Sequence, residues 1–207
     1  MPASFADIAF TPAVQALQRA HGSRTQYARM QARASASTLS EREREFLEQA
    51  DTFYLATVGE TGWPYVQHRG GPRGFVRVRS PSQIAFADFR GNLQYVSAGN
   101  VGEDDRASII VVDVANRKRL KLFGRLRFVD VADADAALAT SVAVPGYRAT
   151  VERVAIFDIV AFDWNCPQHI TQRFTAEEVE AVTRPLEARI ATLEAELQRA
   201  GARVPAA

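Results

Sequence analysis

Polar and cationic side chains stand beside glycines at the end of one predicted strand. Gln67, His68 and Arg69 come first, followed by Gly70 and by a glycine-rich run that ends at Gly74. Such side chains can bind the heteroatoms of a flat ligand, and glycines let a backbone approach the ligand closely. A solvent-facing strand end with a glycine-rich hairpin explains the same residues, so this segment alone leaves both interpretations open.

A second polar segment, residues 86–95, runs from the end of a predicted strand into a predicted helix. Free backbone N–H groups and the positive end of the helix dipole favour an anion such as a phosphate at this junction. Arg90 can add a bidentate charged contact, and Asn92 and Gln94 can add neutral donors. In the alternative interpretation Asn92 only caps the helix.

A third cluster follows a basic turn, where Arg119, Lys121 and Phe123 share one face of an alternating strand. These cations would help to neutralise a dianionic phosphomonoester. A solvated sheet edge is the alternative.

The segment 163–174 is rich in uncommon residue types. Trp164 can stack on a planar ring, Gln168 can hydrogen-bond the edge of that ring, and Arg173 can bind a phosphate or a carbonyl group. A well-packed loop around a buried tryptophan explains the segment equally well.

Metal and nucleophile chemistry receive little support. His21, His68 and His169, together with Cys166, show none of the spacings typical of metal ligands, so no metal site is expected. Cys166 precedes His169 by three residues, but no third group that would orient them is evident, and a lone cysteine is usually inert. Paired catalytic carboxylates are also not evident, and no catalytic residue is assigned.

A β-rich region must position these residues. Short β-type runs separated by turn signals pair most simply as an antiparallel meander or barrel, and we expect a barrel of about six strands. The expected fold is therefore mainly β with helical extensions, an α+β protein. The runs are Phe53–Val58, Pro64–Arg69, Phe75–Arg79, Gln83–Ala87, Ala107–Val114, Leu120–Val129 and Val154–Phe162.

Helices are predicted on both sides of the barrel and within it. Thr11 and Pro12 mark one helix start, a second helix covers about 25–34, and Ser40 with Glu43 forms a capping box for a third. Two helical interruptions, over about 92–99 and 132–142, are expected to cover the openings of the barrel.

The C-terminal region begins with a second capping box, Thr175 to Glu178. Pro185 should kink this helix or restart it. A coiled-coil-like apolar stripe follows, whose partner is either the chain's own barrel or a second subunit. The stripe consists of Val179, Val182, Leu186, Ile190, Leu193 and Leu197.

We expect a helical extension over residues 1–50, a barrel domain over 51–174, and a C-terminal helix and tail over 175–207. The 25 basic residues nearly cancel the 24 acidic ones, so a nucleic-acid partner is not expected. No run approaches the roughly 18 apolar residues that a membrane span needs. The single cysteine and the absence of a signal-peptide pattern predict the cytoplasm.

Taken in order, QHRGG, FADFRGNLQY, RKRLKLFG and WNCPQHI resemble the pyridoxamine 5'-phosphate oxidase-like split-barrel proteins, which bind flavin mononucleotide (FMN). The resemblance covers about residues 40–175. It is greatest to the branch described as predicted flavin-nucleotide-binding proteins. The combination is specific, whereas each segment alone is weak.

The resemblance implies a homodimer of antiparallel split barrels, with FMN in two clefts at the subunit interface. One set of matching positions would line the flavin ring and the ribityl chain: Gln67, His68, Arg69 and Gly70. Another would lie near the phosphate and the ribityl hydroxyls: Asp88, Arg90, Asn92 and Gln94. Arg119 would touch the cofactor, and three residues of the partner subunit would close the cleft: Trp164, Gln168 and Arg173.

The resemblance also implies an FMN-dependent oxidoreductase that acts on a small-molecule substrate or electron donor of unknown identity. The chain lacks the Arg-Leu-His motif that true pyridoxamine 5'-phosphate oxidases carry after the segment of Trp164, so oxidation of vitamin B6 is not expected. Two alternatives stay open. One is a flavin-binding module without turnover, such as a carrier, a sensor or a partner in a two-component system. The other is a barrel for haem or a deazaflavin, in which haem would need His68 or His169.

Overall fold

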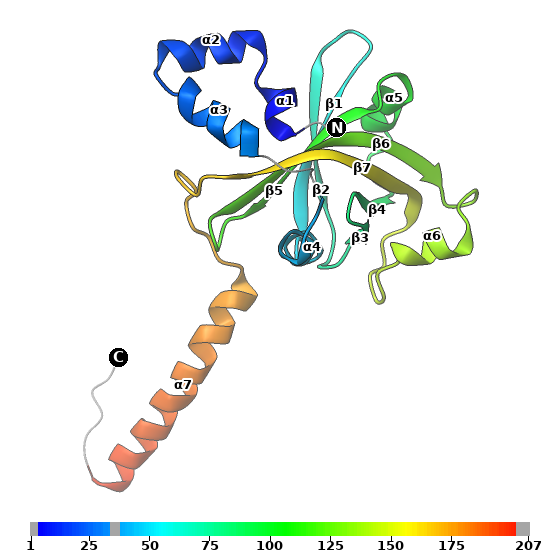
Figure 1. Ribbon diagram of the computed structural model, residues 1–207. Helices are drawn as coiled ribbons and strands as arrows, with labels where there is room; N and C mark the ends of the chain where they lie inside the picture. Colours follow the sequence, from blue (N-terminus) through cyan, green and yellow to red (C-terminus); the bar gives the residue numbers. More distant parts are fainter. Residues whose placement is uncertain (1–3, 34–37, 202–207) are drawn as a thin grey trace. The chain divides into compact units, whose positions relative to one another are not determined.

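A computed structural model describes residues 4–33 and 38–201, which fall into two compact units. The first unit comprises residues up to Asp113 together with Lys118–Pro167, and it contains every strand (Figure 1). The second comprises Val114–Arg117 and the residues from Gln168 onward, including the long C-terminal helix.

The first unit is built on a strongly curved antiparallel sheet with the strand order β2-β1-β5-β6-β7-β4-β3 (Figure 1). The expected antiparallel split barrel is confirmed, but the expected number of about six strands is wrong, because all seven runs form strands. The last strand is long enough to pair with both β6 and β4, which brings the β3–β4 hairpin into the same sheet. The strands are β1 (Thr52–Val58), β2 (Pro64–Gly70), β3 (Val76–Ser80), β4 (Gln83–Phe89), β5 (Arg106–Asp113), β6 (Lys118–Asp130) and β7 (Val151–Asn165).

The core of the barrel is filled by the inward-facing residues of these strands. On β1, Phe53 and Leu55 are buried while Tyr54 between them is exposed, as alternation along a half-buried strand requires. Phe53 stacks on Phe75 and meets the edge of Phe86, with ring centroids 5.7 and 4.9 Å apart. These aromatic contacts join β1 to the β3–β4 hairpin.

Among the described residues, four helices precede the sheet, and two of them start at the predicted caps. Thr11 caps the second helix, and Ser40 and Glu43 form the predicted capping box of the fourth. The first helix was not predicted, and it places Phe5 in a stack on Phe123 of β6 at 4.8 Å. The helices are α1 (Phe5–Ala9), α2 (Pro12–Ala20), α3 (Arg24–Arg33) and α4 (Glu41–Glu48).

Two short helices interrupt the strands, α5 (Val96–Glu103) and α6 (Ala136–Ser141). The expected start of the first near residue 92 is wrong by four residues, because Leu93 and Tyr95 adopt left-handed backbone angles that no helix contains. Tyr95, rather than Asn92, is the N-cap residue. The helix α6 packs its apolar residues against β4 and β7.

In the second unit, α7 (Ala176–Arg199) begins at the predicted capping box of Thr175 and Glu178. It continues through Pro185 as one helix, so the predicted restart at this proline is wrong; a helix interior can retain a proline at the loss of one backbone hydrogen bond. Gln172 donates to the carbonyl of Ala115 at 2.8 Å and accepts from Arg117 at 3.0 Å. In the described part of the chain, no helix has both the length and the apolar character needed to cross a membrane.

Candidate functional site

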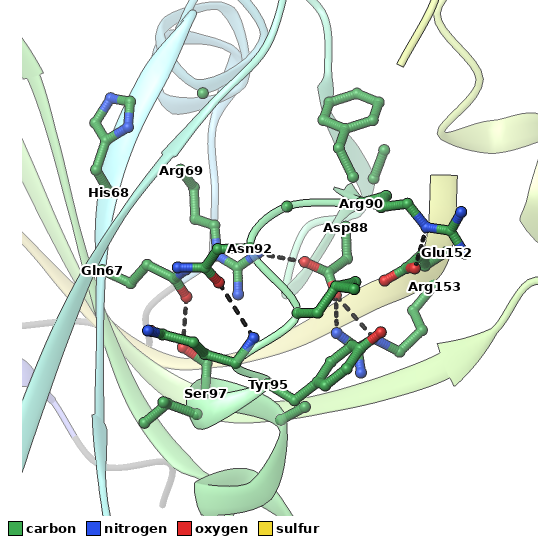
Figure 2. A pocket seen from close by; sticks show the side chains of 18 of the residues that line it. Gln67, His68, Arg69, Asp88, Arg90, Asn92, Tyr95, Ser97, Glu152 and Arg153 are labelled. Carbon is green, nitrogen blue, oxygen red and sulfur yellow. Dashed lines mark hydrogen bonds and ion pairs between the residues drawn. The ribbon is translucent and has the colours of Figure 1, made fainter. Parts of the chain in front are cut away.

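A cleft in the barrel unit lies between β2, the loop after β4, the start of α5 and the start of β7 (Figure 2). Its volume is about 240 Å³. The fold thus brings together two segments, residues 67–70 and 88–94, that sequence reasoning assigned to one ligand. The predicted site residues that border the cleft are Gln67, His68, Arg69, Gly70, Asp88, Arg90, Asn92 and Gln94.

Alternation along β2 decides which of its side chains face the cleft. Gln67 and Arg69 are half-buried on one face of the strand, while His68 between them is exposed. The imidazole Nε2 lies 2.5 Å from the hydroxyl of Thr52, and the ring meets the edge of Tyr54. Figure 2 shows the His68 ring turned away from the polar groups of the cleft, so only the backbone of this residue is suited to contact a ligand there.

The centre of the cleft is Asp88, a buried residue with 2% of its surface exposed. Arg69 donates to one carboxylate oxygen. Arg153 donates to the other through Nε and Nη2, at 2.8 and 2.6 Å. The sheet register sets the second pair, since Asp88 and Arg153 are directly opposite on β4 and β7. A carboxylate is stable at this depth because two cations surround it.

One donor at this centre is not satisfied by any described residue. The Nε atom of Arg69 is buried and has no hydrogen-bond partner in the described part of the chain. An unpaired buried donor costs free energy, so its presence beside a cleft points to a group that arrives from outside the chain. Arg153 is fixed further by the rings of Tyr95 and Phe128, 4.9 and 5.1 Å from its guanidinium carbon.

A second charged pair lies at the rim, where Arg90 Nε donates to the carboxylate of Glu152 at 2.7 Å. This hydrogen bond, with the negative charge of Glu152, raises the pKa of Arg90 above its ordinary value. The Arg90 side chain is 64% exposed, so its guanidinium remains accessible. Three arginines and two carboxylates thus line the cleft, which leaves a net positive charge.

The loop between β4 and α5 is held in an uncommon conformation. Leu93 and Tyr95 have φ angles of 62° and 52° although neither is glycine. Each such residue costs on the order of 1–3 kcal/mol, and this kind of strain clusters at ligand sites. The side chain of Asn92 accepts from the backbone N–H of Gln94 at 3.2 Å, and Ser97 of α5 donates to Gln67 of β2 at 2.9 Å.

The glycines after β2 have roles within the chain itself. A Cβ atom on Gly71 would lie 2.8 Å from Cγ of Phe75 and 3.0 Å from the ring of Phe89. Gly74 has a φ of 83°. These contacts support the alternative interpretation of a glycine-rich hairpin for these two residues, because one allows aromatic packing and the other allows a turn. Gly70 does border the cleft.

The remaining predicted site residues lie outside this cleft or in the other unit. Arg119 donates to the carbonyl of Cys166 at 2.7 Å. Trp164 packs on Phe46 and donates to Glu43 at 2.7 Å. Gln168 and Arg173 belong to the second unit and are exposed. Closure of the cleft by a partner's Trp164, Gln168 and Arg173 stays a prediction.

The cleft residues that sequence reasoning missed include Tyr95, Ser97, Glu152 and Arg153. The last predicted strand began at Val154, which left the preceding charged pair outside it. The signal was available, since Glu152 and Arg153 interrupt a run of residues that is otherwise almost entirely apolar up to Phe162. Two adjacent charges in such a strand place one of them on the inner face.

The chain belongs to the pyridoxamine 5'-phosphate oxidase family, whose family model matches residues 39–163, more than half of its length. The resemblance inferred from the sequence is thereby confirmed. No curated protein sequence is significantly similar to the chain.

Several solved structures are similar to the chain at low identity. HupZ of Group A Streptococcus is 14% identical over 66% of this chain and 99% of its own, with a TM-score of 0.48. An FMN-binding protein of Syntrophomonas wolfei is 13% identical over 72% and 97%, with a TM-score of 0.43. An FAD-binding protein of Mycobacterium smegmatis is 16% identical over 62% and 95%, also with a TM-score of 0.43.

Proposed function

We propose that this protein is a flavoprotein that holds FMN in the cleft and acts as an FMN-dependent oxidoreductase on a small molecule. The observation that carries the proposal is the buried cluster of Arg69, Asp88 and Arg153, with one donor of Arg69 left unpaired. A cleft with net positive charge and a fixed, unsatisfied guanidinium suits an anionic, hydrogen-bonding ligand. Membership of the family supports a flavin nucleotide as that ligand.

The residues of the cleft divide into two kinds of donor. Arg69 and Arg90 are the charged groups suited to the phosphate of FMN, because planar guanidinium groups bind phosphate oxygens in pairs. Gln67, Asn92 and Gln94 offer neutral amides suited to the ribityl hydroxyls or to the edge of the ring. Asp88 keeps Arg69 and Arg153 in place without being a donor itself.

Bound FMN supplies the electron-transfer chemistry, and the chain supplies binding, orientation and electrostatics. Of the charged groups, Arg69 combines a low exposure of 15% with a fixed position, so it is the best placed to stabilise negative charge on a ligand within the cleft. The proposed reaction needs no acid–base pair from the chain. Oxidation of vitamin B6 is not proposed, since the Arg-Leu-His motif is absent after Trp164.

We propose further that the working form is a homodimer with the cofactor at the subunit interface. The cleft of about 240 Å³ is smaller than the roughly 300–1,000 Å³ that is usual for sites of small ligands, so a second surface is needed to enclose FMN. The outer face of β1 and β2 supports a protein partner, because it exposes Tyr54 and Val66, at 46% and 60%.

The first experiment is a spectrum of the purified protein. We expect a yellow protein that releases FMN when it is denatured, is bleached by NADH or NADPH, and regains its colour in air. Release of FMN without bleaching would favour the non-catalytic flavin module over the enzyme. A colourless protein that does not bind added FMN would refute both.

The phosphate assignment is tested by Arg90→Ala. Loss of a charged hydrogen bond of about 1.5–3 kcal/mol should weaken FMN binding by on the order of 10- to 100-fold, as measured by quenching of flavin fluorescence. Arg127→Ala is the matched control, because Arg127 is exposed on β6 and does not line the cleft. Equal affinities of the two variants would contradict the assignment.

The structure does not favour haem in this cleft. A haem ligand must point its imidazole nitrogen at the iron, and the ring of His68 faces away and contacts Thr52 and Tyr54. The cytoplasm is the proposed location, since the free, exposed thiol of Cys166 is typical of a reducing compartment.

A further inference from the structure

The helix α7 carries an apolar stripe that no described residue of its own unit covers. All six side chains of the stripe are 40–65% exposed, and α7 contains no buried residue. Six large apolar side chains in line on one helix exceed what scattered surface residues explain, so this face is suited to a partner. The stripe is formed by Val179, Val182, Leu186, Ile190, Leu193 and Leu197.

The spacing of the stripe is an eleven-residue repeat rather than a seven-residue one. The steps along it are three, four and four residues, and the sequence Val179, Val182, Leu186 is then repeated by Ile190, Leu193 and Leu197. Eleven residues complete three turns of an α-helix to within about 20°, so the stripe runs nearly straight along α7. Two such helices can pair along their full length with little supercoiling.

The opposite face of α7 is polar or small and suited to water. Glu180 and Arg184 form an ion pair there at 2.5 Å. Ala181 and Ala188 also lie on this face, since each is more than 130° around the helix from the middle of the stripe at about 100° per residue. The helix therefore has one apolar face, which is the pattern of a two-stranded pair.

We propose that α7 pairs in parallel and in register with α7 of a second copy of this chain. The charges that flank the stripe favour this partner and this direction. Arg189 directly precedes Ile190 and Glu194 directly follows Leu193. In a parallel pair, a side chain at the first of these positions meets the partner's side chain five residues further along. Arg189 of each copy therefore meets the partner's Glu194, and symmetry gives two such contacts.

An antiparallel pair would place Arg189 near the partner's Arg189 and Glu187 near the partner's Glu187, because like flanks then face each other. Within the described residues, neither Arg189 nor Glu194 forms an ion pair in its own chain, so both are available to a partner. In a parallel, in-register pair each side chain of the stripe packs against the same side chain of the second copy, so one sequence can supply both halves of the interface.

A second copy is also the partner that association of the barrels would bring close to α7. A helix of 24 residues is only marginally stable alone in water, and pairing buries the apolar face that would stabilise it. If the barrels associate, the two tethered helices meet at an effective concentration in the millimolar range. The pairing does not depend on flavin, so it stands or falls separately from the proposed function.

The test is disulfide cross-linking of the full-length protein on a Cys166→Ser background. Leu197→Cys introduces a thiol into the proposed seam, and Ala195→Cys is the matched control on the outer face. We expect mild oxidation at micromolar protein concentration to yield a covalent dimer at least about tenfold faster for Leu197→Cys, because a disulfide requires Cα atoms within about 7 Å.

Equal rates at the two positions, or no dimer with Leu197→Cys, would overturn the proposal. An antiparallel pair separates the introduced thiols by about 27 Å along the axis, at 1.5 Å per residue, and gives no dimer. Packing of α7 on its own barrel, or on a different protein, also gives none. Each rival arrangement thus produces the contrary result.

A second pair of variants, on the Leu197→Cys background, checks that the seam causes the cross-link. Leu186→Glu with Ile190→Glu places charge in the stripe and should slow cross-linking at least about tenfold. Ala181→Glu with Ala188→Glu adds the same charge on the opposite face and should leave the rate unchanged. Circular dichroism confirms that the barrel is folded in each variant; undiminished cross-linking by the stripe variant would refute the pairing.

Discussion

Asp88 and Glu43 are the two acidic side chains buried among the described residues, at 2% and 5% exposure, and their partners differ in charge. Asp88 accepts from two guanidinium groups, those of Arg69 and Arg153. Glu43 accepts from neutral donors, the hydroxyl and backbone N–H of Ser40 and the indole of Trp164.

The charge of the partners distinguishes a carboxylate in a ligand site, Asp88, from one that only joins two elements, Glu43. Neutral donors around Glu43 join α4 to the end of β7, and none of these donors is among the unpaired buried atoms of the described residues. Two cations around Asp88 leave a net positive charge and one unpaired buried donor beside a cleft. In this protein, the buried carboxylate with two positively charged partners lies in the candidate site, and the buried carboxylate with neutral partners has a structural role.

The largest expected effect is that of Asp88→Asn. Removal of the charge leaves two guanidinium groups facing each other at low exposure, so the free energy of unfolding should fall by about 3–5 kcal/mol. FMN binding should also weaken, because Arg69 and Arg153 lose the group that orients them. Urea unfolding and flavin titration measure the two losses.

If Asp88→Asn lowered the free energy of unfolding by less than about 1 kcal/mol and left FMN affinity unchanged, Asp88 and Glu43 would not differ in role. Asp133→Asn is a suitable control for the change itself, since Asp133 is exposed and lies outside the cleft.

A smaller effect is expected of Glu43→Gln. The amide keeps one acceptor oxygen and the shape of the side chain, and neither Ser40 nor Trp164 carries a charge that would be left unpaired. We expect a loss of about 1–2 kcal/mol in the free energy of unfolding by urea denaturation. FMN affinity should stay the same, and a marked loss of flavin would show that Glu43 also serves the site.

The smallest effect is a pH dependence. Burial by itself raises the pKa of Glu43, but hydrogen bonds from Ser40 and Trp164 outweigh burial, and the pKa is lowered from its ordinary value of 4.5. A lowered pKa gives stability that is fully present above the ordinary value and is lost as the pH falls through the lowered one.

The stability difference between the wild type and Glu43→Gln should therefore be constant above about pH 5.5 and shrink below pH 4.5. Urea unfolding at several pH values measures this difference, and subtraction of the two curves cancels the titration of other carboxylates. A difference that grows as the pH falls would mean that the pKa of Glu43 is raised instead.

Local sequence patterns determined the elements and part of the site. Two helix starts were predicted from capping boxes, since a capping box involves residues only three apart. These boxes are Ser40 with Glu43 and Thr175 with Glu178. Alternation and turn residues indicated all seven β-runs. Gln67, Arg69 and the segment 88–94 were assigned to one ligand from the family resemblance, and the fold places them around one cleft.

The tertiary structure alone decided the partners of these residues. Arg153 meets Asp88 across 65 positions in the chain, and Trp164 meets Glu43 across 121. Pairings at such separations are fixed by the register of neighbouring strands and by packing, which no local pattern encodes. The same register turned His68 away from the cleft and brought β3 and β4 into the sheet through β7. The sequence could therefore name which residue types serve the site, whereas the sheet determined which of them meet.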